Sequence, residues 1–238
     1  MKFYNFHTHQ PNFHPDVIAI ESFDLSEPHE ALDSRYGQDS FTPDERTQKS
    51  LAEAVANNKH FFSVGVHPWR IEASKREAAN QSFDKVSQLA RLAKIVAIGE
   101  TGLDKHTAKT ANDYHFQQEV FISHARLSEE VKKPLIIHCV KAWDDLLNIR
   151  KAIHPEVPWI IHGFRGKKLL ASRLIDAGFH LSFGMYYQME SLKEAWACRR
   201  LLLETDDKQI DIRDVYKQVA DDLAVSEQHL AEGIQGFS

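Results

Sequence analysis

Eight short apolar runs divide this chain of 238 residues, and most of them are separated by longer segments with helical spacing. A strand that is covered on both faces appears in a sequence as a continuous apolar run of this length. Eight such strands alternating with helices predict one (β/α)8 barrel, of the TIM type, over residues 1–238. The runs are Lys2–Phe6, Val17–Phe23, Phe61–Val66, Ile95–Ile98, Leu135–Ile137, Trp159–Ile161, Phe179–Phe183 and Leu201–Leu203.

Helix signals lie between these runs. Thr42-Pro43-Asp44-Glu45 resembles an N-cap followed by proline and two acids in a first turn. Asn112–Val131 has apolar residues at helical spacing, and Leu169–Ala177 ends at Gly178, which is a common helix stop. A doubly wound open sheet is the alternative fold, but no GxGxxG motif follows the first run. The run Val17–Phe23 is the weakest strand prediction, because a long polar stretch follows it.

The composition restricts the cellular setting and the partners. A net charge of −5 argues against a surface that coats nucleic acid, although a small cationic site could still hold a phosphate. Neither Cys139 nor Cys198 lies in a CxxC pair, so no disulfide framework is expected. The start MKFYNFHTH has no basic-then-apolar region, and no apolar run is long enough to cross a bilayer. We therefore expect a cytoplasmic protein without membrane contact, with a monomer as the default oligomeric state.

Potential metal ligands occur at the ends of five of the apolar runs. His7 and His9 lie two residues apart at the end of the first run, so both side chains point to the same face of that strand. The carboxyl ends of all strands of a barrel meet at one face. A carboxylate buried there is costly unless it is paired or binds a metal. The ligands that follow the later runs are Glu100, His138, His162 and Asp206.

Four histidines and two carboxylates exceed what one tetrahedral metal needs. They suit two divalent ions about 4 Å apart, with one carboxylate bridging them. Such a pair lowers the pKa of a water molecule and neutralises charge on a phosphoryl or acyl oxygen. The mixed nitrogen and oxygen donors are compatible with Zn, Mn, Mg or Ni.

Six ordered motifs carry a family resemblance that covers nearly the whole chain. They resemble the motifs of the TatD family, which comprises metal-dependent deoxyribonucleases and related hydrolases of the amidohydrolase superfamily. GETGLD and LLETD are the most specific of them. The motifs are HTH at 7–9, GVHPW at 65–69, IGETGLD at 98–104, IIH at 136–138, HGFRG at 162–166 and LLLETD at 201–206.

The resemblance implies a role for each motif residue. It implies that His7 and His9 bind one metal together with Asp206. It implies that His138 and His162 bind a second metal and that Glu100 bridges the two metals. His67 is implied to contact a substrate phosphate.

The chain departs from the family pattern mainly in the residues expected to face the substrate. Asn5 stands where the family usually has aspartate. Cys139-Val140-Lys141 follows His138 where the family often has Ser-Arg, so Lys141 is the candidate to replace that arginine. HCFSG becomes HGFRG, which adds Arg165, and Asp207 follows the ETD motif in place of alanine. Metal binding is therefore better supported than any particular substrate.

The leading hypothesis is hydrolysis of a phosphodiester in single-stranded DNA or a related small substrate, by a water activated between two metals. Asp206 would accept the proton of that water and Glu100 would fix the metal spacing. His67, Arg165 and Lys141 would stabilise phosphoryl oxygens. Two alternatives stay open: hydrolysis of an amide, lactone or ester at the same site, and a non-catalytic metal-binding interaction module.

Other residues near the motifs have weaker functional interpretations. Trp69 and Trp143 could stack on a base or pack as part of a lid. Lys167 and Lys168 could contact phosphate, but lysines at a helix start are usually solvated. Cys139 is expected to be a small buried residue that points away from the site. The remaining nine histidines are expected on the surface or in packing.

Overall fold

Eight parallel strands form the centre of the structure, a computed structural model that describes residues 1–10, 14–25 and 61–234. Each strand is hydrogen-bonded to its neighbour in the order β1 to β8, which confirms the predicted barrel. The prediction for Val17–Phe23 is also confirmed, since this run pairs with both of its neighbours. The strands are β1 (Phe3–Thr8), β2 (Val17–Asp24), β3 (Phe61–Gly65), β4 (Ile95–Asp104), β5 (Leu135–Val140), β6 (Trp159–Ile161), β7 (Phe179–Phe183) and β8 (Leu201–Leu203).

The barrel closes between its first and last strands mainly at the carboxyl end. Just beyond β8, the Asp206 amide donates to the carbonyl of His7 at 3.1 Å, and the His9 amide donates to the carbonyl of Asp206 at 3.0 Å. Further down β1, a helix side chain satisfies the strand edge instead. The Tyr216 hydroxyl accepts from the Tyr4 amide at 3.2 Å and donates to the Tyr4 carbonyl at 3.3 Å.

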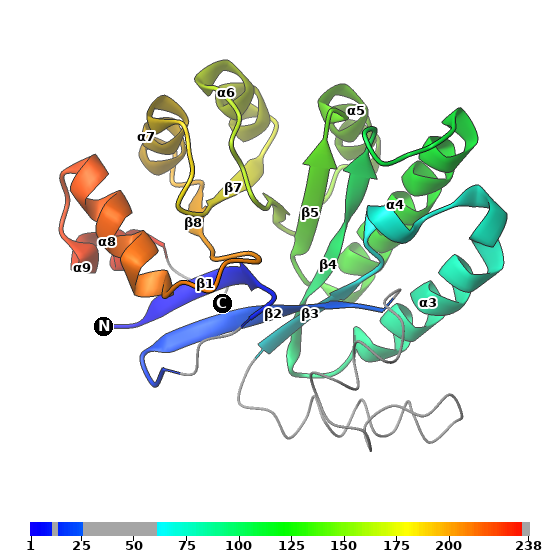
Figure 1. The fold of residues 1–238 in the computed structure, drawn as a ribbon, viewed down its shortest axis with the longest axis horizontal. Helices are drawn as coiled ribbons and strands as arrows, with labels where there is room; N and C mark the ends of the chain where they lie inside the picture. Colours follow the sequence, from blue (N-terminus) through cyan, green and yellow to red (C-terminus); the bar gives the residue numbers. More distant parts are fainter. Residues whose placement is uncertain (11–13, 26–60, 235–238) are drawn as a thin grey trace.

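Helices cover the outside of the strands, as Figure 1 shows. In the described part of the chain, no helix lies between β1 and β3. The helix predicted to begin near Thr42 lies outside the described residues. The helical segments are η1 (Pro68–Arg70), η2 (Ala73–Lys75), α3 (Arg76–Leu89), α4 (Ala111–Val131), α5 (Trp143–Ile153), α6 (Lys168–Asp176), α7 (Met189–Ala197), α8 (Ile212–Leu223) and α9 (Glu227–Gly233).

Helix α4 shows how local sequence positions the site. It begins at a capping box, in which the Thr110 side chain accepts from the Asp113 amide and the Asp113 carboxylate accepts from the Thr110 amide. Its buried Gln117 accepts a hydrogen bond from the Asp104 amide at 2.9 Å and donates to the carbonyl of Pro68 at 3.1 Å. This side chain therefore fixes the ends of β4 and of the β3 loop relative to each other.

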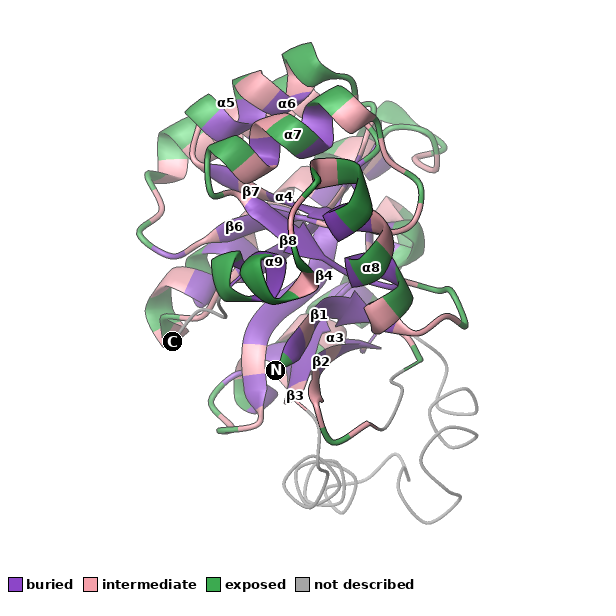
Figure 2. Ribbon diagram, turned by 90° about the vertical axis from the view of Figure 1, so that its left-hand side faces the viewer, coloured by how far each residue is buried: buried purple, intermediate pink, exposed green. Residues whose placement is uncertain are grey.

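The core lies inside the barrel and between the barrel and its helices. Figure 2 shows buried strands beneath helices whose outer faces are exposed. Between α4 and the strands, the Trp159 ring packs against Phe121 and Phe179 at centroid distances of 5.5 and 5.9 Å. Burial of each such ring contributes about 1.5–3 kcal/mol to stability. No helix among the described residues is long and apolar enough to cross a membrane.

Two strands extend three residues or more beyond the apolar runs that predicted them. The prediction ended one strand at Ile98 and another at Ile137, whereas β4 continues to Asp104 and β5 to Val140. Both extensions contain polar residues, which the apolar pattern does not recognise as strand. The ladder continues because these residues stay paired with each other, for example Gly102 with His138. Glu100 and His138 therefore lie within strands and not after them.

Candidate metal centre

Glu100 occupies the middle of a cluster of histidines at the carboxyl ends of the strands. One of its carboxylate oxygens, Oε2, lies 3.3 Å from Nε2 of His7 and 3.6 Å from Nε2 of His9. Asp206 faces the same two imidazoles, with Oδ1 at 3.6 Å from His7 and 3.8 Å from His9. His7 and Glu100 are buried, whereas the side chains of His9 and Asp206 are each 27% exposed. The first half of the cluster is thus open to solvent on one side.

The other oxygen of Glu100 faces three different imidazoles. Oε1 lies 2.9 Å from Nε2 of His67, 3.1 Å from Nδ1 of His138 and 2.7 Å from Nε2 of His162. His138 and His162 also lie side by side, with 3.3 Å between Nδ1 and Nε2. The two oxygens of one carboxylate therefore face two separate sets of nitrogen donors.

The described residues contain three groups of side chains that could each hold a metal ion, and all three lie in this cluster. Within each group the potential ligand atoms lie within 4.8 Å of one another. Two of the groups share Glu100. The groups are His7 with His162 and Asp206, His7 with His9 and Glu100, and His67 with Glu100 and His138.

The donor set fits divalent metal ions on two grounds. Among the described residues, neither ring nitrogen of the fully buried His7 forms a hydrogen bond. A buried imidazole without a hydrogen bond is costly, and a bound cation would use the lone pair of one nitrogen. The mixture of imidazole and carboxylate donors is also one that first-row divalent metals accept.

Two glycines of the GETG motif allow Glu100 to reach its position. Gly99 has a φ of +132° and Gly102 a φ of +152°, which residues with a side chain rarely adopt. A Cβ atom at Gly99 would collide with the carbonyl oxygen of Ile136, and one at Gly102 with that of His138. The motif therefore has glycine at the two positions where β5 lies too close to β4 for a side chain.

The charges in the cluster support one another. Burial alone would raise the pKa of Glu100, but the surrounding imidazoles, His162 and His67 foremost, hold it well below its usual value. Burial opposes protonation of His162, but the charge of Glu100 outweighs this and raises the His162 pKa well above its usual value. Burial is the main cause of the lowered pKa of His7. At His9, attraction to Glu100 overcomes burial and raises the pKa.

Two further carboxylates, for which no role was predicted from the sequence, contact the histidines on the side away from Glu100. Asp104 Oδ2 lies 3.2 Å from Nε2 of His138, on the side of the ring away from Glu100. Glu204 is fully buried, with Oε1 at 3.6 Å from Nδ1 of His162 and accepting from the Gly163 amide at 2.6 Å. Carboxylates in this position orient a ligating imidazole and raise its basicity. Same-face spacing is the signal that could have identified them, since Asp104 follows Glu100 by four residues in β4.

The segment after β8 is held against β1 by polar side chains. The Asn5 amide group donates to the Thr205 hydroxyl at 2.8 Å, and the Thr205 amide donates to Asn5 Oδ1 at 3.1 Å. The Thr205 hydroxyl in turn donates to the hydroxyl of Thr8 at 3.0 Å. Asn5, one of the departures from the family pattern, thus links β1 to the ETD motif, and this link positions Asp206.

The three residues predicted to contact substrate occupy different places. His67 is close to Glu100 and belongs to one of the potential ligand groups. Lys141 and Arg165 are exposed at the ends of β5 and β6, and neither forms an ion pair within the described part of the chain. Trp69 is 61% exposed, but its indole nitrogen donates to Asp104 at 2.8 Å. Its ring is therefore fixed beside the cluster.

The packing predictions for two other residues agree with the structure. Cys139 is buried, and burial raises the pKa of its thiol to about 12. His124 is buried in α4, where its Nε2 accepts from the Val66 amide at 3.1 Å and burial lowers its pKa to about 4. Both side chains have structural roles outside the cluster.

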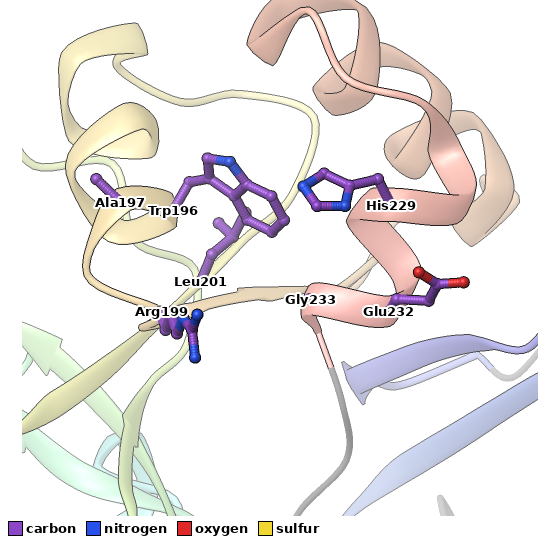
Figure 3. A pocket seen from close by; sticks show the side chains of 7 residues that line it. All are labelled: Trp196, Ala197, Arg199, Leu201, His229, Glu232 and Gly233. Atoms are coloured by element: carbon purple, nitrogen blue, oxygen red, sulfur yellow. The ribbon is translucent and has the colours of Figure 1, made fainter.

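A separate hollow of about 600 Å³ lies between α7, β8 and α9. Figure 3 shows the rings of Trp196 and His229 next to each other in its lining, and they are nearly perpendicular, with a centroid distance of 5.6 Å. Its lining includes Leu201, the first residue of β8, so it lies at the opposite end of that strand from Asp206. None of the potential metal-binding groups of the described residues lies there.

The chain is similar to known proteins over nearly its whole length. The family model described as TatD related DNase matches residues 6–232. The crystal structure of YJJV, a TatD homologue from Escherichia coli K12, superposes on 98% of this chain and 94% of its own with a TM-score of 0.65. At 20% sequence identity, this likeness shows the fold alone.

Two curated relatives match part of the chain. YcfH from Escherichia coli K12, named an uncharacterized metal-dependent hydrolase, is 36% identical over 155 residues, or 61% of this chain and 54% of YcfH. Human TATDN2, named a 3'-5' RNA nuclease, is 33% identical over 129 residues, or 50% of this chain and 17% of that protein. The matched part of the chain thus spans little more than half of YcfH and a minor part of TATDN2.

Proposed function

This chain belongs to the TatD related DNase family, and on that premise we propose that it is a metal-dependent hydrolase that cleaves phosphodiester bonds in single-stranded nucleic acid. The observation that carries the proposal is the position of Glu100, whose two oxygens face two sets of imidazoles. One carboxylate shared by two donor sets suits a pair of divalent cations. Phosphodiester hydrolysis is a common use of such a pair.

The proposed ligands divide between the two oxygens of Glu100. Bound divalent cations would lower the pKa of a water molecule and neutralise charge on the phosphoryl oxygens. The ion could be Zn, Mn, Mg or Ni, because the donor set suits each of them. His7, His9 and Asp206 would hold one ion and His138 and His162 the other, and Glu100 would contribute to both sites.

The protein's own side chains would handle the proton and the phosphate. Asp206 is partly exposed at the open side of the cluster, where its carboxylate can take the proton of an attacking water. His67 has a side chain that is 12% exposed beside Glu100 and can donate to a phosphoryl oxygen. Lys141 and Arg165 supply positive charge at the neighbouring strand ends.

Two considerations favour a phosphodiester over an amide or lactone. Glu100 lies between the two sets of imidazoles, whereas the amidohydrolase alternative would lead us to expect a carboxylated lysine in that position. One relative, TATDN2, is named an RNA nuclease, and the family description is that of a DNase. RNA therefore belongs beside DNA among the substrates to test.

The test is an activity assay on metal-free protein reloaded with Mn, Mg, Zn or Ni. Single-stranded DNA, single-stranded RNA, a nitrophenyl phosphodiester and a lactone panel form the substrates. We expect turnover of at least one diester, and we expect Glu100→Gln to lose both activity and bound metal by elemental analysis while the circular dichroism spectrum stays native. Glu130→Gln, an exposed carboxylate on α4, is the matched control. An active Glu100→Gln protein without metal, or turnover of lactones alone, would contradict the proposal.

A further inference from the structure

A hollow of about 400 Å³ lies between the β6 loop, the β7 loop and α8. Arg165 lines one side of it, three residues after His162 in the β6 loop. Tyr186 and Gln188 line another side from the loop that follows β7. Because His162 belongs to the metal cluster, this hollow borders the same face of the barrel as the proposed active site.

The Tyr186 ring is presented to solvent by a loop that is held in place. Its neighbours are anchored to α8, since the Gln218 amide donates to the carbonyl of Met185 and to the hydroxyl of Tyr187, both at 3.0 Å. The hydroxyl of Tyr187 donates to Asp222 at 2.5 Å. Tyr186 itself is 67% exposed. A large exposed aromatic ring on a fixed loop is the arrangement that stacks on a nucleobase at low entropic cost.

Arg165 provides positive charge beside this ring. Its guanidinium carbon lies 6.0 Å from the centre of the Tyr186 ring. The β6 loop that carries it is tied to α7 by the Ser191 hydroxyl, which donates to the carbonyl of Gly166 at 2.7 Å. No acid forms an ion pair with Arg165 within the described ranges, and the acid in the same lining, Asp222, is bound to Tyr187. A phosphate can therefore approach the Arg165 side of the hollow.

We propose that this hollow, the Tyr186 subsite, binds the nucleotide next to the scissile phosphate, with its base stacked on Tyr186 and its phosphate paired with Arg165. The inference rests on the proposed function, because it gives the substrate of that site a defined path. A base can reach an exposed ring only when it is unpaired, so the subsite selects single strands over duplexes. The hollow is large enough for a nucleotide, since ligand pockets begin at about 300 Å³.

The test compares substrates with and without a base. In wild-type protein, kcat/KM is measured for a short single-stranded oligonucleotide and for a nitrophenyl phosphodiester. We expect Tyr186→Ala to lower the ratio of these two values about tenfold or more, and to weaken binding of a cleavage-resistant phosphorothioate oligonucleotide by a similar factor. Tyr186→Phe keeps the ring and should keep most of the ratio. Arg165→Gln should also weaken binding of the oligonucleotide, whereas Arg126→Gln, which removes an exposed arginine on α4, should not.

The outcomes separate this subsite from the proposed function. If wild-type protein cleaves diesters but Tyr186→Ala changes neither the ratio nor the binding, the subsite is wrong and the proposed function stands. If no diester is cleaved with any metal, the proposed function fails, and the binding measurement alone still decides whether Tyr186 contacts nucleic acid. Binding of an acidic peptide that depends on Tyr186, without binding of the oligonucleotide, would overturn the inference in favour of a protein partner.

Discussion

Replacing Asp104 by asparagine should weaken metal binding without disturbing the fold. Asp104 accepts four hydrogen bonds, two on each oxygen. Oδ1 accepts from the amides of His106 and Thr107 at 2.8 and 3.1 Å. Oδ2 accepts from the Trp69 indole at 2.8 Å and faces Nε2 of His138 at 3.2 Å. An asparagine whose oxygen keeps the two backbone bonds must turn its NH₂ group toward Trp69 and His138.

That NH₂ group is a donor and would face two donors. His138 could adapt only by moving its ring proton from Nε2 to Nδ1. Nδ1 is the nitrogen that faces Glu100 at 3.1 Å, so the move would remove the lone pair available for a metal. Loss of such a carboxylate behind a ligating histidine typically costs 10–100-fold in metal affinity, which is about 1.4–2.7 kcal/mol.

The assay is a competition titration with a metal-binding dye at fixed pH. We expect Asp104→Asn to lose about 10–100-fold in affinity for one of the bound ions. Asp145→Asn is the control, because Asp145 is a nearby carboxylate that pairs with Lys105 and Tyr114 and lies outside the cluster. A folded Asp104→Asn protein with wild-type affinity for every ion would refute the role of Asp104 in orienting His138.

Two further predictions concern the ion pair of His162 with Glu100 and the contact of Tyr216 with Tyr4. Burial opposes protonation of His162, but the charge of Glu100 raises its pKa well above the usual value, so a metal ion must compete with a proton for His162. Metal affinity should therefore rise as pH rises through the neutral range. Calorimetry in two buffers of different ionisation enthalpy should detect the released proton as a difference in the heat of metal binding. A heat of binding that does not depend on the buffer would contradict this prediction. Tyr216→Phe should lower the free energy of unfolding by about 1–2 kcal/mol in urea, because it leaves the Tyr4 backbone without its partner, whereas Tyr186→Phe should not.

The barrel could be predicted because its strands are buried on both faces. Such strands appear in the sequence as continuous apolar runs, which can be recognised without knowledge of the strands they pair with. The convergence of Glu100 with histidines from distant segments follows from the fold alone, since parallel strands of a barrel end at one face. The closure of the barrel between β1 and β8 could not be predicted from the sequence. Tyr216 and Tyr4 are 212 positions apart, and no local pattern marks their contact.

The carboxylates behind the histidines are an intermediate case. Asp104 follows Glu100 by four residues in β4, and Glu204 precedes Asp206 by two residues just after β8. The spacing was visible in the sequence, but a buried acid can serve as a ligand or as a support for one. Only the contact of Asp104 with the far nitrogen of His138 separates these roles. Sequence therefore located the acids of the site without assigning each to a task.

The metal ligands could be predicted from the sequence more fully than the substrate contacts, and the pairing of the strands explains the difference. The ladder that pairs Gly102 with His138 fixes where His138 projects, because a shift of one residue would turn its side chain to the other face. Glu100 lies in the irregular stretch just before this ladder, where Gly99 and Gly102 allow its position. Although the Phe164 amide still donates to the carbonyl of Ser182 at 2.9 Å, Arg165 and Tyr186 lie beyond the last paired residues of β6 and β7. Their approach depends on the local anchors at Gly166, Met185 and Tyr187. Because those anchors are independent of the ladder, changes in these loops can alter the substrate while the metal centre stays intact.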